Sequence, residues 1–240
     1  MLKFCLTVDC EKLISFKQGN PRWSFYNRFK GRINSMIKHI RYNEQGFKIF
    51  YEEIKKQKFP CTFMLTGKLF NPVEKLSFIE WGYHSYNHLP LTLLSDEKIR
   101  REVNNIFQVN SMTPPLWMVE DVKNPKRVFE ILKENGYKNI VYKGKDDGIK
   151  CMHYFDVKSP EIRSGIKCVH LSNCFEGNFS NHKIKLIKRD ILKNLDKEGV
   201  YVLSTHDFTH KNTKNLKSII FFVKELEKEG KLKIINLKDA

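Results

Sequence analysis

Two pairs of side chains have the types and spacing of a divalent-metal site. Asp9 and Glu11 stand two positions apart at the end of an apolar run. His84 and His88 stand four positions apart in the segment HSYNH. Side chains alternate faces along a strand, so Asp9 and Glu11 share a face if the strand continues through them. Two carboxylates so placed repel each other unless a cation or a proton occupies the site. One carboxylate and two histidines form a metal site with positions open for water and substrate.

Each pair also has a simpler interpretation. The carboxylates could lie in a solvated loop, and two surface histidines would give the same spacing. On the metal interpretation, the spacing of His84 and His88 predicts a helical turn with both imidazoles on one side. Cys10 is an alternative soft ligand if the strand ends before it. The donor set suits zinc, iron, cobalt, nickel or manganese, so ligand type does not identify the metal.

A further histidine stands at the end of another apolar run, in the segment LSTHD. His206 titrates near neutral pH and is therefore suited to donate a proton in catalysis. Asp207 or another carboxylate would hold it protonated. The alternative is a structural histidine paired with Asp207 or His210.

The hydrophobic pattern predicts the elements that must hold these side chains. Short apolar runs indicate strands, and apolar residues at helical spacing indicate amphipathic helices. Ser95 is typical of a helix N-cap and Gly136 of a C-terminal cap. Because strands alternate with helices, the pattern predicts a parallel sheet, either open or closed. The predicted strands are 2–8, 61–66, 78–81, 138–142, 167–171, 200–205 and 232–237, and the predicted helices are 46–57, 96–107, 124–135, 183–195 and 213–229.

Two long segments interrupt this alternation, 11–41 and 143–166. Long insertions after strands are where α/β folds commonly keep their sites. Within the first, residues 21–41 interleave basic and aromatic side chains. A basic amphipathic helix of this kind can lie on an anionic membrane surface. The alternative is an ordinary helix that packs its isoleucines on the sheet.

Composition narrows the classes of partner and location. Lys and Arg number 43 against 27 Asp and Glu, a formal net charge of +16. This charge favours anionic partners, although a solvated lysine surface would give the same count. We expect no specific nucleic acid, because no nucleic-acid motif is present. Without a secretory signal or an apolar span, we expect a cytoplasmic protein, with a peripheral position at the inner membrane face as the alternative. The six cysteines form no CxxC pair and are expected to be reduced and buried.

Together the motifs resemble those of the NodB-type polysaccharide deacetylases. TVDCE is similar to that family's first motif, HSYNH to its second, and LSTH to its fifth. The resemblance implies an α/β fold, a distorted (β/α)7-type barrel that forms a single domain over residues 1–240. It makes Asp9 the catalytic base and His206 the acid. It makes Glu11, His84 and His88 the ligands of a divalent metal, with Zn²⁺ favoured.

The resemblance also implies a reaction, the removal of an N-acetyl or similar N-acyl group from a sugar. The backbone N–H of Leu116 or Trp117, just after a proline pair, would hold the oxyanion. The Trp117 side chain would either stack on a sugar ring or pack in the core. A cytoplasmic enzyme would meet an N-acetylated sugar intermediate, and the positive charge suits a phosphate-bearing or lipid-linked one.

The sequence departs from the family pattern in its third and fourth motifs. Thr113 stands where the family has an arginine before the proline pair, and Arg163 is a candidate to replace it. Asp146 and Asp147 are candidates for the fourth-motif acid, with a solvated turn as the alternative. Two other functions therefore stay open: a catalytically impaired barrel that binds carbohydrate or lipid-linked sugar, and a hydrolase of a non-sugar amide.

Overall fold

The structure is a computed structural model that describes residues 1–11, 46–67, 72, 74–120, 124–143 and 156–240 of the chain. Predictions for residues 21–41, Asp146 and Asp147 lie outside the described residues. The strands are β1 (Leu2–Cys10), β2 (Cys61–Leu65), β3 (Ile79–Tyr83), β4 (Ser111–Met112), β5 (Asn139–Tyr142), β6 (Glu161–Arg163), β7 (Ile166–Cys174), β8 (Val200–His206) and β9 (Leu232–Ile235). The α-helices are α2 (Gly46–Gln57), α3 (Asp96–Glu102), α4 (Arg127–Glu134), α5 (Asn181–Lys193) and α6 (Lys214–Lys228).

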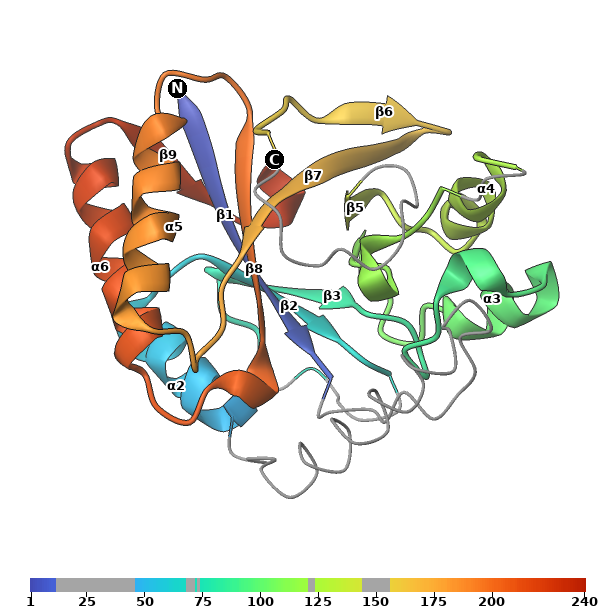
Figure 1. Ribbon diagram of the computed structural model, residues 1–240. Coiled ribbons are helices and arrows are strands. Elements are labelled where there is room, and N and C mark those ends of the chain that lie inside the picture. Colours follow the sequence, from blue (N-terminus) through green and yellow to red (C-terminus); the bar gives the residue numbers. More distant parts are fainter. Residues whose placement is uncertain (12–45, 68–71, 73, 121–123, 144–155) are drawn as a thin grey trace, which may run out of the picture.

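Seven of these strands close into a parallel barrel (Figure 1). Pairing runs from β1 through β2, β3, β4, β5, β7 and β8 and returns to β1. Strand β9 also pairs in parallel with the first half of β1, while β6 pairs antiparallel with the start of β7. The predicted distorted (β/α)7-type barrel is therefore confirmed. The closing contact between β1 and β2 decides between the closed and open sheets that the hydrophobic pattern left unresolved.

The side chains of each strand alternate between an outer core and the barrel interior. On β1, Phe4, Leu6 and Val8 pack in an outer core that includes α2, α5 and α6. A second outer core lies under α3 and α4, on the other side of the barrel (Figure 1). Cys5 belongs instead to the cluster that fills the interior. Asp9 has the same parity as Cys5, so strand alternation directs its carboxyl group inward.

Most predicted elements are found, with shifted ends. Helix α2 spans 46–57 as predicted, while α3 ends at 102 rather than 107. Gly136 has the predicted left-handed conformation after α4, with φ of 84°. Strands β4 and β6 were not predicted, because two or three residues are too few to show a period.

The remaining fold-level predictions concern thiols and membrane spans. All five described cysteines are free, and four of them are buried. Cys174 is the partly exposed one. Within the described part of the chain, no helix combines the length and apolar character needed to cross a bilayer.

Candidate metal site and acid–base pair

The two carboxylates lie where β1 ends. The strand continues through Cys10, so Asp9 and Glu11 share the inward face and are 1% and 9% exposed. The Glu11 backbone N–H donates to Asp207 Oδ1 at 3.0 Å, which fixes the chain just beyond the strand. Cys10 points the other way, into the outer core, and its thiol donates to the Val8 carbonyl. Cys10 is therefore not a ligand, contrary to the alternative that the sequence allowed.

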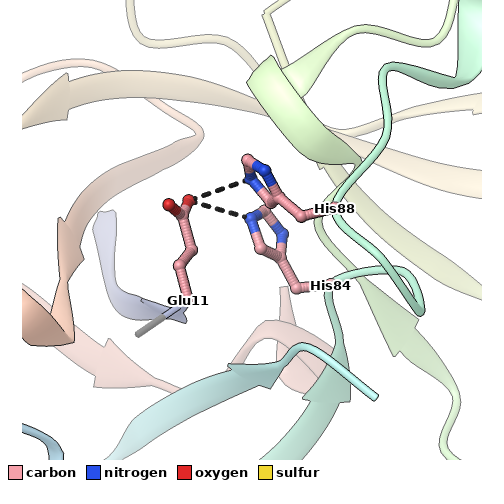
Figure 2. Close-up of side chains that lie close together, drawn as sticks. All are labelled: Glu11, His84 and His88. Atoms are coloured by element: carbon pink, nitrogen blue, oxygen red, sulfur yellow. Dashed lines mark hydrogen bonds and ion pairs between the residues drawn. The ribbon is translucent and has the colours of Figure 1, made fainter. Parts of the chain in front are cut away.

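Both histidines of HSYNH approach one oxygen of Glu11 (Figure 2). The Nε2 atoms of His84 and His88 lie 3.2 and 3.1 Å from Glu11 Oε1. The predicted helical turn is wrong, because this segment is an irregular loop in which Ser85 and His88 have φ of 64° and 60°. The left-handed residues reverse the chain, so the two rings still lie close together, with centroids 4.8 Å apart.

A backbone contact sets the orientation of His84. Its Nδ1 lies 2.6 Å from the carbonyl oxygen of Thr113. A carbonyl only accepts hydrogen bonds, so Nδ1 carries the proton, and in the neutral ring Nε2 keeps its lone pair. Metal-binding histidines are commonly fixed in this way by an acceptor at the other ring nitrogen. Thr113, which stands where the sequence resemblance led us to expect an arginine, thus contributes through its backbone.

His206 joins the same cluster from the end of β8. Its Nε2 lies 3.4 Å from Glu11 Oε1, and its Nδ1 lies 2.6 Å from Glu176 Oε1. Glu176 is 8% exposed and follows β7. Sequence reasoning considered another carboxylate at His206 but did not identify Glu176. Its position two residues beyond a long apolar strand is the signal that would have found it.

Asp207 and His210, the partners suggested for His206, have other contacts. Asp207 accepts the Glu11 N–H, and burial raises the pKa of its carboxyl group to about 7. His210 Nε2 lies 2.8 Å from Thr205 Oγ1, and its ring packs edge-on against Phe50. Asp207 therefore holds the end of β1, and His210 holds the end of β8.

Burial and the neighbouring charges shift the pKa values of the side chains in this cluster. Burial raises the pKa of Asp9, although the nearby imidazoles of His84 and His206 act against it. Burial also opposes ionisation of Glu11, but His88 and His206 lower the pKa of its carboxyl group well below the usual range. For His206, burial lowers the pKa, but Glu176 and Glu11 outweigh it and raise the pKa well above its ordinary value.

The donor set fits a divalent metal. Glu11, His84 and His88 offer ligand atoms within 4.8 Å of one another, as do Asp9, Glu11 and His206. Among the described residues, buried Asp9 Oδ1 has no hydrogen-bond partner, and His88 Nε2 approaches Glu11 without hydrogen-bond geometry. Buried polar atoms without partners are costly. A cation between these groups would supply the missing contacts and offset the carboxylate charge.

The other predicted site residues divide into two groups. Leu116 and Trp117 lie in a 3₁₀ helix, Pro115–Trp117, where both have positive φ. Trp117 is 4% exposed and packs in the barrel interior, with its ring centroid 6.0 Å from that of His206, which favours the core role considered for it. Arg163 lies on β6, beside the first residue of β7, and pairs with Glu120 and Glu161. Because this is the amino end of β7, Arg163 does not take the position beside Asp9 that was considered for it.

Comparisons with known proteins agree with this geometry at the level of the fold. No family model and no curated protein sequence matches the chain. Among solved structures, a putative polysaccharide deacetylase from Mycobacterium smegmatis is similar, with a TM-score of 0.65 and 14% identity over 99% of this chain and 88% of that one. A 4-alpha-glucanotransferase from Thermococcus litoralis is similar with a TM-score of 0.57 and 12% identity, over 100% of this chain and 38% of that one. The barrel is therefore one that the structure of a putative polysaccharide deacetylase shares.

Proposed function

We propose that the chain is a metal-dependent amide hydrolase that removes an N-acetyl or similar N-acyl group from a sugar. The observation that carries the proposal is the convergence of the His84 and His88 Nε2 atoms on Glu11 Oε1, beside Asp9 and His206. A metal triad next to a carboxylate and a carboxylate-bound histidine contains the parts that amide hydrolysis needs. The similarity to the structure of a putative polysaccharide deacetylase supports the choice of reaction class.

In this proposal Glu11, His84 and His88 hold the metal, with zinc favoured. A divalent ion there supplies Lewis acidity and lowers the pKa of a coordinated water from about 15.7 to about 7. The interior face of β1 places Asp9 next to these ligands, in the group that it forms with Glu11 and His206. Asp9 is the base that takes the proton from the attacking water.

His206 is the acid in this proposal. The amide C–N bond breaks as the nitrogen takes a proton from His206 Nε2, so that the amine leaves in a neutral form. Glu176 accepts from Nδ1, which fixes the ring and favours its protonated state. Asp9 on β1 and His206 on β8 act as base and acid from neighbouring strands.

A backbone N–H in the 115–117 turn is the proposed oxyanion donor. The Trp117 N–H already donates to the Pro114 carbonyl at 2.8 Å. Leu116 is therefore the better of the two predicted candidates. Its left-handed conformation, with φ of 59°, is the kind of backbone strain that sites retain where a group must be aimed.

The substrate class follows from the proposed reaction and the charge. An N-acetylated sugar or glycan is the proposed substrate, and the formal net charge of +16 favours one that bears phosphate or is lipid-linked. Peripheral contact with an anionic membrane through residues 21–41 stays part of this proposal.

Metal analysis and acetate release test the function together. Purified protein should contain about one divalent metal ion per chain and release acetate from N-acetylated sugars supplied free and as nucleotide-linked forms. Glu11→Ala and His84→Ala should lose both the metal and acetate release. Metal retained by both variants would rule out the site, and metal binding without acetate release from any sugar or simple amide would rule out the hydrolase.

A sugar-binding barrel without catalysis is the second candidate. Its supporting observation is the set of charged groups that shift the pKa of Asp9, which consists of histidines and a carboxylate: His84, His206, Glu11 and His88. Within the described residues no arginine orients the base, since Thr113 occupies that position and Arg163 lies elsewhere. This candidate predicts saturable sugar binding by a metal-loaded protein that releases no acetate.

A further inference from the structure

The loop that carries the two histidines is held in an unfavourable conformation. Ser85 and His88 both have positive φ, which costs about 1 kcal/mol or more for residues other than glycine. Such a loop needs external contacts to keep both Nε2 atoms aimed at Glu11. The His88 N–H donates to Ser85 Oγ at 3.0 Å, and the Gly67 N–H donates to the Ser85 carbonyl at 2.9 Å. These contacts fix the ends of the turn but not its centre.

Glu102 binds the centre of the turn from the last residue of α3. Its carboxylate accepts two hydrogen bonds from Asn87, at 2.8 Å from the backbone N–H and 2.7 Å from the side-chain amide. Its backbone carbonyl accepts the Tyr86 N–H at 2.8 Å. Glu102 is 3% exposed, so this carboxylate satisfies its hydrogen-bonding needs through the loop rather than through water.

We propose that Glu102 is a positioning residue for the metal site, acting through Asn87 on the direction of His84 and His88. The inference rests on the metal site of the proposed function. Charge-assisted hydrogen bonds in a buried setting are among the stronger contacts that a protein can make. Because the two bonds to Asn87 end one residue before His88, they restrain the backbone that sets the His88 ring.

The test measures metal affinity, not turnover, in four proteins. Zn²⁺ and Co²⁺ dissociation constants are measured by chelator competition on wild type, Glu102→Ala, Glu102→Gln and Glu97→Ala. Glu97 is the matched control, because it lies on the same helix but is exposed and pairs only with Arg101 within the described residues. We expect Glu102→Ala to weaken binding by about 10–100-fold, the usual effect of losing a group that supports a metal ligand. Glu97→Ala should bind as wild type does.

Glu102→Gln keeps the size of the side chain and one acceptor oxygen for Asn87, so it should fold and lose less affinity than the alanine variant. A double-mutant cycle with Asn87→Ala tests whether Glu102 affects metal affinity through Asn87. Asn87→Ala removes only the side-chain bond and keeps the backbone N–H bond to Glu102. If Glu102 acts through Asn87, the double variant should therefore bind metal about as weakly as Glu102→Ala alone, whereas independent effects would multiply.

The outcomes separate this inference from the function it rests on. Wild-type protein that binds no metal would overturn the metal site itself. Wild-type protein that binds metal, with a Glu102→Ala variant of equal affinity, would overturn only the positioning role. A Glu102→Ala variant whose metal-free form unfolds at lower temperature but whose affinity is unchanged has lost a purely structural contact, and that result also rejects the proposal.

Discussion

Asp9 and His206 lie opposite each other in the parallel register of β1 and β8. Both strands direct these residues to the barrel interior, and both residues have ligand-type atoms within 4.8 Å of Glu11. One carboxylate oxygen, Glu11 Oε1, thus lies within 3.4 Å of the proposed acid and of both histidines of the HSYNH loop. Because Asp9 is the proposed base and His206 the proposed acid, each residue can be tested separately.

Replacing Asp9 by asparagine should remove the base and leave the metal ligands in place. We expect acetate release to fall by about 10²–10⁴-fold, the usual contribution of a positioned base. Metal content should stay near that of wild type. Ser204→Ala is the control, because it deletes only the hydroxyl that donates to Asp9 Oδ2 at 3.3 Å. Unchanged turnover in the asparagine variant would contradict the proposed mechanism.

Glu176→Gln should change the pH dependence of turnover. Glu176 and Glu11 raise the pKa of His206 above its ordinary value despite burial. An acid must be protonated to act, so the rate falls as pH rises through this pKa. Removing the Glu176 charge lowers the pKa, and the alkaline limb of the pH–rate profile should therefore move to lower pH.

A glutamine still accepts from His206 Nδ1, so the ring should keep its position in that variant. The matched control is Glu161→Gln, because Glu161 pairs with His170 instead of His206. An alkaline limb that does not move in Glu176→Gln would show that Glu176 does not set the protonation of the acid.

Metal removal should destabilise the protein. A ligand present at about 100 times its dissociation constant stabilises the folded state by about 2.7 kcal/mol. Protein treated with a chelator should therefore melt at a lower temperature and recover when Zn²⁺ is restored. His88→Ala should melt at the same temperature with and without the metal. A metal-dependent shift that persists in this variant would place the bound ion elsewhere.

His210 should make the free energy of unfolding depend on pH. Burial lowers its pKa from 6.5 to about 4, so the unfolded chain binds a proton more readily than the folded protein. This contribution is fully present above pH 6.5 and is lost as pH falls towards 4, by about 3 kcal/mol at most. Urea unfolding at pH 7, 5.5 and 4.5 measures it. His210→Gln should show a smaller loss over the same range than wild type.

The sequence predicted the parts of the site that local spacing determines. The two-residue step from Asp9 to Glu11 fixes a shared face once β1 continues through Cys10, and that strand is found. The spacing of His84 and His88 identified the pair but not its backbone. A helix and a left-handed turn can both bring residues four positions apart together, and nothing in HSYNH alone indicated positive φ at Ser85 and His88.

Contacts between distant segments could not be predicted in the same way. Glu176 binds His206 from thirty positions away. The Thr113 carbonyl binds His84 through a backbone atom, which any residue type would supply. Arg163 was considered for the site because its charge suited the role, yet the antiparallel pairing of β6 with the start of β7 places it elsewhere. Such positions depend on which strand ends meet, and that is a property of the closed barrel.

The closing of that barrel also has a consequence for how the chain folds. Strand β1 is near the start of the chain, but its Lys3 pairs with Val200 and its Leu2 with Leu232. Contacts so far apart in sequence carry a high entropic cost of loop closure and slow the folding of a chain. During synthesis, one edge of β1 must therefore wait until β8 and β9 have been made. The register that sets Asp9 opposite His206 is consequently a late event in folding, and the proposed activity should appear after most of the helical structure.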